Sequence, residues 1–213
     1  MSELILNLLV IAGVIITSGI IFILVHQKRK RERQEIDALA QQNGWLVERI
    51  QEPLARGFRL IGPGWVLETV IRSSGQEAEP GSTNMEQKTT WFSNKPCQPL
   101  LIGPRTTSLD LGPFAEQLMK KIIRDALGRE ADGVREVTIG DTTFEKKYLV
   151  LARDESEVEK VLTPAIQTAL TTWQKVLPVI IRTNEGTRIE LKGVHLRKNE
   201  EIAALVQLGE MFL

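Results

Sequence analysis

An uncharged apolar run at the start of the chain is the feature that most constrains its fold. The run covers residues 4–25, LILNLLVIAGVIITSGIIFILV, and a basic segment, residues 28–33, follows it closely. As a helix that rises 1.5 Å per residue, the run would be roughly 33 Å long, which is enough to cross a hydrocarbon core of about 30 Å. We therefore expect a single N-terminal transmembrane helix.

Two other interpretations of this run, a cleavable signal peptide and a buried core helix, fit less well. A signal peptide carries its positive charges before its apolar region, whereas only Met1-Ser2-Glu3 precedes this one. A core helix would normally show a polar face. Because the flanking cations all follow the run, the positive-inside rule places the rest of the chain in the cytoplasm. We expect a single-pass protein of the inner membrane with its N-terminus outside.

The basic segment supplies the only site residues that the sequence assigns. They form a membrane-surface site that consists of Lys28, Arg29, Lys30, Arg31 and Arg33. Each cation near an anionic leaflet contributes on the order of 1 kcal/mol, so anionic lipid headgroups are one expected partner beside the bilayer itself. The alternative is that the segment acts only as an orientation signal.

The remaining composition limits the classes of function. After residue 33 the chain holds 22 basic and 25 acidic residues, so its body is mildly acidic and nucleic acid is not an expected partner. Cys97 is the only cysteine, as is common in a reducing compartment. We divide the chain into an anchor (1–27), a basic juxtamembrane helix (28–44) and a cytoplasmic domain (45–213). That domain is either one unit or two subdomains, 45–110 and 111–213.

Turn and cap signals in the body predict an α+β fold of mainly antiparallel sheet with packed helices. The juxtamembrane helix should end at Asn43-Gly44. Strands are expected at 58–60, 65–71, 88–92 and 99–102, with a surface loop at 73–84, and helices from 113, 154, 163 and 199. Hairpins are expected to join 134–139 to 143–152 and 177–183 to 187–191. Asp154 and Glu157 form the pattern of a capping box, Thr163-Pro164 begins another helix, and Asn199 is expected to cap the last one.

Residues that could carry chemistry are few. The two histidines, His26 and His195, lie far apart in the sequence, and nothing near Cys97 predicts a lowered thiol pKa. Whether the carboxylates of Asp110, Asp141 and Glu145 meet in a cleft stays open. The sequence contains no Gly-rich phosphate loop between a strand and a helix. We assign no catalytic, cofactor-binding or metal-ligating residues.

One segment is similar to a known pattern. Phe144, Tyr148 and Val150, then Asp154, then Leu162-Thr163-Pro164, follow a Phe-x3-Phe-x-Val, Asp, Leu-Thr-Pro order, with Tyr148 where Phe is usual. This order resembles uncharacterised bacterial membrane-anchored proteins with a domain of unknown function. The resemblance implies a cytoplasmic domain tethered to the membrane and transfers no catalytic residue.

Two classes of function remain. The first is a non-catalytic protein whose cytoplasmic domain binds or scaffolds another membrane-associated protein. The second is a membrane-tethered enzyme or a domain that binds a small ligand or a lipid. A deep, partly apolar pocket with converging polar groups would favour the second class, and a shallow apolar patch would favour the first.

Overall fold

A computed structural model gives the structure of the chain over residues 2–73, 85–105, 114–174 and 176–213. The side chains of residues 2–16, 114–116, 118 and 119 lie outside the description. The surface loop expected at 73–84 and the Gly112-Pro113 start of a helix fall almost wholly outside the described residues, as does Asp110.

The described residues form six helices, one short 3-10 helix and a nine-stranded sheet. The helices are α1 (Ser2–Asn43), α2 (Phe114–Leu127), η1 (Gly128–Ala131), α3 (Thr142–Lys147), α4 (Glu155–Val161), α5 (Pro164–Thr171) and α6 (Asn199–Glu210). The strands are β1 (Leu46–Gln51), β2 (Ala55–Gly62), β3 (Trp65–Ser73), β4 (Met85–Ser93), β5 (Leu100–Pro104), β6 (Arg135–Glu136), β7 (Tyr148–Ala152), β8 (Val179–Thr183) and β9 (Gly186–Lys192).

All strand pairs in the sheet are antiparallel, in the order β1-β2-β3-β4-β9-β8-β5-β7-β6. The chain leaves α1 through Gly44 at a φ of 70° and turns between β2 and β3 through Gly64 at a φ of 81°, a backbone region that glycine adopts without strain. Because β4 pairs with β9 and β5 pairs with β8, strands from residues 45–110 and 111–213 share one sheet. The expected α+β class with antiparallel sheet is confirmed.

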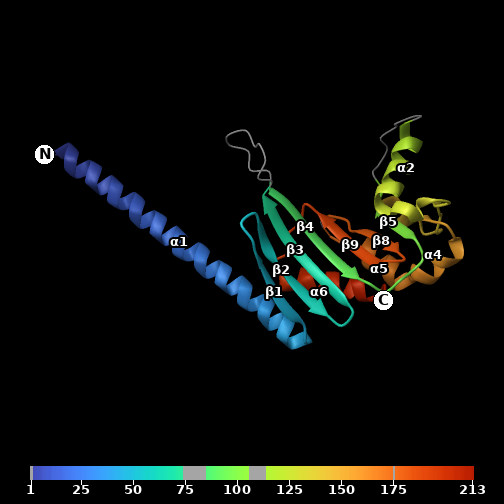
Figure 1. Cartoon of the computed structure of the whole chain (residues 1–213). Coiled ribbons are helices and arrows are strands. Elements are labelled where there is room, and N and C mark those ends of the chain that lie inside the picture. Colours follow the sequence, from blue (N-terminus) through green and yellow to red (C-terminus); the bar gives the residue numbers. More distant parts are fainter. Residues whose placement is uncertain (1, 74–84, 106–113, 175) are drawn as a thin grey trace.

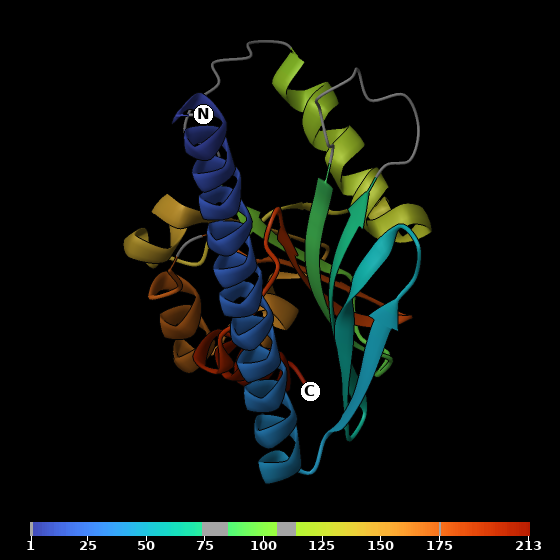
Figure 2. The ribbon, with the colours of Figure 1, turned by 90° about the vertical axis from the view of Figure 1, so that its left-hand side faces the viewer.

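The two faces of the sheet pack differently. Side chains that alternate along the strands send Leu67, Trp91 and Ile189 into the main core, which α3 to α6 and the end of α1 cover. On the opposite face, Ile123 and Leu127 of α2 pack against β5, β7 and β8. Figure 2 shows α1 and α6 on one side of β1 to β4, so the other side of these strands is the sheet face that α2 does not reach.

A buried polar network fastens the segment between β9 and α6 to the sheet. The hydroxyls of Thr69 and Thr89 lie 2.8 Å apart, and Thr89 donates to the carbonyl of Val194 at 2.9 Å. The backbone amide of Leu196 donates back to the Thr69 hydroxyl at 3.2 Å. Since both threonines are fully buried, these bonds satisfy groups that would otherwise lose their contact with water.

The expectation of a transmembrane helix requires correction. Over the residues whose side chains the structure describes, no helix combines the length and the apolar character needed to cross a membrane. The prediction of a membrane-spanning helix in the fold is therefore wrong for the described chain.

Two local predictions also differ from the structure. Residues 143–147 were expected in a strand but belong to α3, because the Asp141 carboxylate accepts hydrogen bonds from the amides of Thr143 and Phe144 and caps a helix. The partner strand is reduced to β6, which pairs with β7. Asn199 does not cap α6; the cap position is Lys198, which makes no side-chain capping bond.

The remaining cap predictions were more successful. Asp154 accepts a hydrogen bond from the Ser156 amide and Thr163 accepts one from the Ile166 amide, so α4 and α5 begin where the sequence places them. Glu157, however, pairs with Lys160 at 2.7 Å instead of completing a capping box. The hairpin of β8 and β9 is also confirmed, with Thr183 opposite Gly186.

Candidate functional site

The apolar segment of α1 is exposed in the structure. Six consecutive large apolar residues, Ile20 to Val25, have relative exposures between 43 and 73%. Because six consecutive residues go more than once around a helix, the apolar surface faces all directions. In Figure 1, α1 projects from the body as a long isolated helix. Water is a poor surrounding for such a surface, so this segment is a candidate for contact with another apolar phase.

The structure places the five predicted membrane-surface cations directly after this segment. Lys28, Arg29, Lys30, Arg31 and Arg33 all lie on α1 and all are exposed. One helix therefore carries an apolar segment and a cationic segment in tandem. We call residues 17–33 the apolar-basic segment. This order of apolar residues followed by cations matches the order of hydrocarbon and anionic headgroups in a leaflet.

The last part of α1 is held firmly on the body. Ile36 and Ala40 are buried in the main core. The guanidinium of Arg49 in β1 pairs with the carboxylate of Asp37, and the side-chain amide of Asn199 in α6 donates to the carbonyl of Glu35 at 3.1 Å. These contacts tie α1 to one edge of the sheet and to α6.

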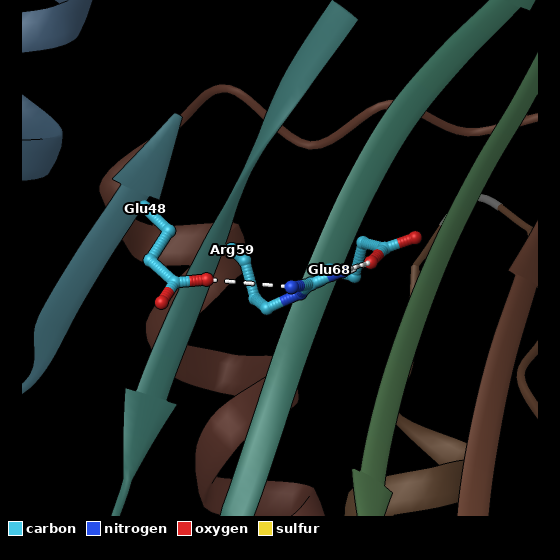
Figure 3. A network of polar contacts seen from close by, with 3 residues as sticks. All are labelled: Glu48, Arg59 and Glu68. Carbon is cyan, nitrogen blue, oxygen red and sulfur yellow. Dashed lines mark hydrogen bonds and ion pairs between the residues drawn. The ribbon is translucent and has the colours of Figure 1, made fainter. Parts of the chain in front are cut away.

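A second candidate surface is the uncovered face of β1 to β4 and β9. Here Arg59 bridges two carboxylates on neighbouring strands, at 2.6 Å to Glu68 and 3.3 Å to Glu48 (Figure 3). The hydrogen bond to Glu68 raises the pKa of Arg59 above its ordinary value. Further along the same face, the nearly buried Glu190 accepts from Lys88 at 3.1 Å and from Arg188 at 3.0 Å.

This charged face has a shallow depression, and the charges around it are of both signs. A shallow depression of ≈ 680 Å³ lies over it, lined by charged residues of both signs and by Ile61, Val66 and Phe92. Cross-strand ion pairs of this kind are common on solvated sheets and contribute little each. We therefore interpret this face as a solvated surface of the sheet.

A third candidate is a groove of ≈ 540 Å³ between α5 and α6, called the α5–α6 groove below. Its floor includes Leu191 and Leu196, which are buried. Its walls include Trp173 on one side and Ala204 and Met211 on the other. The structure leaves Trp173 half-buried. The sequence signal that was missed is a stripe at i, i+4, i+7 and i+11 along α6, formed by Glu200, Ala204, Gln207 and Met211.

The candidate chemical groups named from the sequence have structural roles or lie apart. Asp141 caps α3, and Glu145 accepts from the amides of Ile139 and Gly140 at 2.7 and 2.9 Å. Cys97 donates from Sγ to the carbonyl of Thr183 at 3.2 Å. His26 stacks on Phe22 within α1, whereas His195 lies in the body against Phe58. In the described part of the chain, no group of three His, Cys, Asp or Glu residues is placed to hold a metal ion.

The apolar and aromatic residues that carry the family resemblance, Phe144, Tyr148, Val150 and Leu162, belong to the core, whereas Asp154, Thr163 and Pro164 are exposed. Phe144 and Tyr148 stack with ring centroids 5.2 Å apart, and both are fully buried, as is Val150. The Tyr148 hydroxyl donates to the carbonyl of Leu170 at 3.3 Å, which links β7 to α5. Burial raises the pKa of Tyr148 well above its ordinary value, so this hydroxyl stays protonated. The pattern therefore combines core residues with the caps of α4 and α5.

Comparison with known proteins gives one match. No match to a curated protein or to a solved structure was found. Residues 100–183, from β5 to β8, match the model of a family described as Protein of unknown function (DUF3137). The segment from Phe144 to Pro164 lies inside the matched residues. This part of the chain is therefore similar to a domain of unknown function.

Proposed function

We propose that this chain is a non-catalytic protein that works at a lipid membrane, where its α+β body binds another membrane-associated protein. The observation that carries the proposal is the apolar-basic segment of α1, with exposed apolar residues from Ile20 to Val25 and exposed cations from Lys28 to Arg33. A lipid bilayer offers both an apolar interior for the apolar residues and anionic headgroups for the cations.

The free energies of apolar transfer and of charge attraction both favour association of α1 with a membrane. Moving a large apolar side chain out of water contributes about 1.5–3 kcal/mol, and each cation near an anionic leaflet adds on the order of 1 kcal/mol. No long flexible linker joins α1 to the body, since α1 ends at Asn43 and β1 begins at Leu46. Between them, the amide of Trp45 donates to the carbonyl of Ala40 at 2.8 Å. The body is thus kept close to whatever surface α1 occupies, which raises its effective concentration toward partners there.

The proposal includes a location on the cytoplasmic side of a bacterial inner membrane. Three features support this location: the cationic segment, because cytoplasmic leaflets are anionic; the single cysteine; and the resemblance to bacterial membrane-anchored proteins. The proposed non-catalytic role is supported by the carboxylates of Asp141, Glu145 and Asp154, each of which is engaged in capping a helix or its entry.

Vesicle flotation of the full-length chain tests this function. We expect the chain to float with phosphatidylglycerol-containing vesicles and to do so more weakly with pure phosphatidylcholine. The double variant Phe22→Asn with Leu24→Asn should lose flotation, whereas Leu54→Asn, at an apolar residue of the body that is 56% exposed, should keep it.

The cations need their own comparison. Replacing Lys28, Arg29 and Lys30 by Gln should remove the preference for anionic vesicles, while the same change at Lys121, Arg124 and Arg129, which are exposed near α2, should not. Flotation that is indifferent to both sets of changes would contradict a membrane role for α1.

The alternative, a domain that binds a small ligand or a lipid, is favoured by one observation. The α5–α6 groove has a volume within the range of about 300–1,000 Å³ that small-molecule sites show, and most of its lining is apolar. A small molecule retained by the purified chain and lost on the substitution Ala204→Arg would support this alternative over protein binding.

A further inference from the structure

We propose that the α5–α6 groove binds an amphipathic helix of a partner protein, about three turns long and basic at one end. The inference rests on the proposed role as a binding protein and names the surface and the partner chemistry. It draws on the shape of the groove, the side chains on its walls and its charge.

The shape of the groove suits a helix. Along one wall, Glu200, Ala204, Gln207 and Met211 follow each other at i, i+4, i+7 and i+11, so they form one stripe along α6. From residue 200 to residue 211 this stripe runs about 17 Å, which is about three helical turns. A partner helix that lies along it would present apolar residues at i, i+3 or i+4, and i+7 to the floor of the groove.

The walls allow a close approach. Ala169 on α5 and Ala204 on α6 line the groove with side chains of a single carbon. Interaxial distances between packed helices depend on the side chains at the contact and are smallest where these are small. A third helix between α5 and α6 would extend the layer of helices that already covers this face of the sheet (Figure 1).

The groove also contains the residue types that dominate protein interfaces. Trp173 is held by a hydrogen bond from Nε1 to the Val176 carbonyl at 3.1 Å, so its ring is oriented before any partner arrives. Val176 and Met211 stay 43 and 39% exposed at the groove. Tryptophan and methionine are enriched in interface cores, and a preoriented ring loses little entropy on binding.

Charge specifies the partner further. Among the described residues, the charged ones that line the groove are Lys198, Glu200 and Glu201, and all three lie at the start of α6. The sum at this end is negative, so a lysine or arginine in the facing turn of the partner is favoured over a carboxylate. Toward Met211, the described lining residues of α6 are uncharged and include Gln207 and Leu208.

A model peptide provides the test. The probe is a labelled synthetic helix of about 14 residues, with leucines at i, i+3, i+4 and i+7 spacing, lysines in one terminal turn and glutamines elsewhere. Fluorescence anisotropy is recorded with the full-length chain in phosphatidylcholine nanodiscs, and empty nanodiscs give the background. The control peptides are a scrambled sequence of the same composition and a version with glutamates in place of the lysines.

Two matched variants of the chain localise the binding. Ala204 is exposed inside the groove and Ala165 is exposed on α5 outside it. We expect Ala204→Arg to weaken binding at least about tenfold and Ala165→Arg to leave it within about twofold. We also expect the acidic peptide to bind more weakly than the basic one and the scrambled peptide to stay at background.

Several outcomes would overturn the inference. They are equal binding of the scrambled peptide, equal losses in both variants, and no binding above empty nanodiscs. A small molecule found in the purified chain by native mass spectrometry and lost with Ala204→Arg would assign the groove to a ligand instead. A dimer lost with the same variant would assign it to a second copy. Vesicle flotation does not depend on Ala204, so a failure of the membrane proposal is recognised separately.

Discussion

Arg49 of the edge strand β1 forms an ion pair with Asp37 of α1, and this pair joins the projecting helix to the sheet. The same guanidinium donates to the carbonyl of Arg33 at 3.2 Å and lies 5.9 Å from the centre of the Phe58 ring. Together with the bond from Asn199 to Glu35, these contacts set the direction in which the apolar-basic segment leaves the body.

Replacing Arg49 by Met should loosen the end of α1 without unfolding the body. Both side chains of the pair are partly exposed, so the loss of global stability should stay below about 1 kcal/mol. Amide hydrogen exchange over residues 33–43 should become faster than in the wild type, while exchange in β3 and β4 should not change. Arg56→Met, at an exposed arginine of β2, is the control, and equal exchange in both variants would mean that Arg49 does not hold α1.

Gly209→Ala should destabilise the fold although alanine is the better helix former. A Cβ at Gly209 would lie 2.2 Å from Cε2 of the buried Trp91 ring, so α6 or the ring must move. Overpacking of this kind costs about 1–3 kcal/mol, measurable by urea denaturation. Gly103→Ala in β5 is the control because a Cβ there meets no heavy atom within 4 Å. Equal stabilities of the two variants would contradict the packing of α6 on Trp91.

Thr89→Val should destabilise the chain by about 1–3 kcal/mol, because it removes the hydroxyl that joins Thr69 to the Val194 carbonyl inside the core. The segment after β9 that this network fastens contributes Val194 and Leu196 to the α5–α6 groove, so peptide binding should weaken as well. Thr90→Val, one residue along β4 and on the opposite face of the sheet, should change stability by less than about 0.5 kcal/mol. A larger loss of stability in Thr90→Val than in Thr89→Val would show that the hydroxyl network does not stabilise the fold.

His195 should make stability depend on pH. Burial lowers the pKa of His195 below its ordinary value, and the positive charge of Arg197 lowers it further, although Glu32 acts in the opposite direction. As the pH falls through about 6.5, the unfolded chain takes up this proton first, so the free energy of unfolding should decrease until the folded histidine also protonates.

The measurement is urea denaturation between pH 5 and pH 8. His195→Gln should show a smaller decrease in stability toward pH 5 than the wild type. His26→Gln, on the projecting part of α1, is the control and should keep the decrease. If His195→Gln and the wild type have the same pH dependence, the histidine is not desolvated in the fold.

Local signals in the sequence predicted much of the body. The cap at Asn43-Gly44 and the start of α5 at Thr163-Pro164 depend on residues next to each other in the chain. The antiparallel class followed from short connections between strands. The helix α3 was missed because residues 143–147 precede a strand, and only the capping bonds of Asp141 and Glu145 reveal the local helix.

The long-range features of the fold could not be predicted from the sequence. The order of the strands brings β9 beside β4 and β5 beside β8, and no local pattern encodes this. The α5–α6 groove depends on the distance between two helices, so Trp173 and Ala204 could not be recognised as neighbours. The exposed cations of α1 were predicted, because their exposure follows from their charge. The transmembrane helix was not confirmed over the described residues.

The most direct test of the central claim, that α1 places the body at a membrane, is a fluorophore that reports its surroundings. Cys97→Ser removes the native thiol, and a cysteine introduced by Phe22→Cys or by Ala204→Cys in the full-length chain is labelled with an environment-sensitive dye. With phosphatidylglycerol-containing vesicles, we predict a blue shift and a gain in intensity for the dye at residue 22 and none for the dye at residue 204. No change at residue 22, or equal changes at both positions, would contradict the claim.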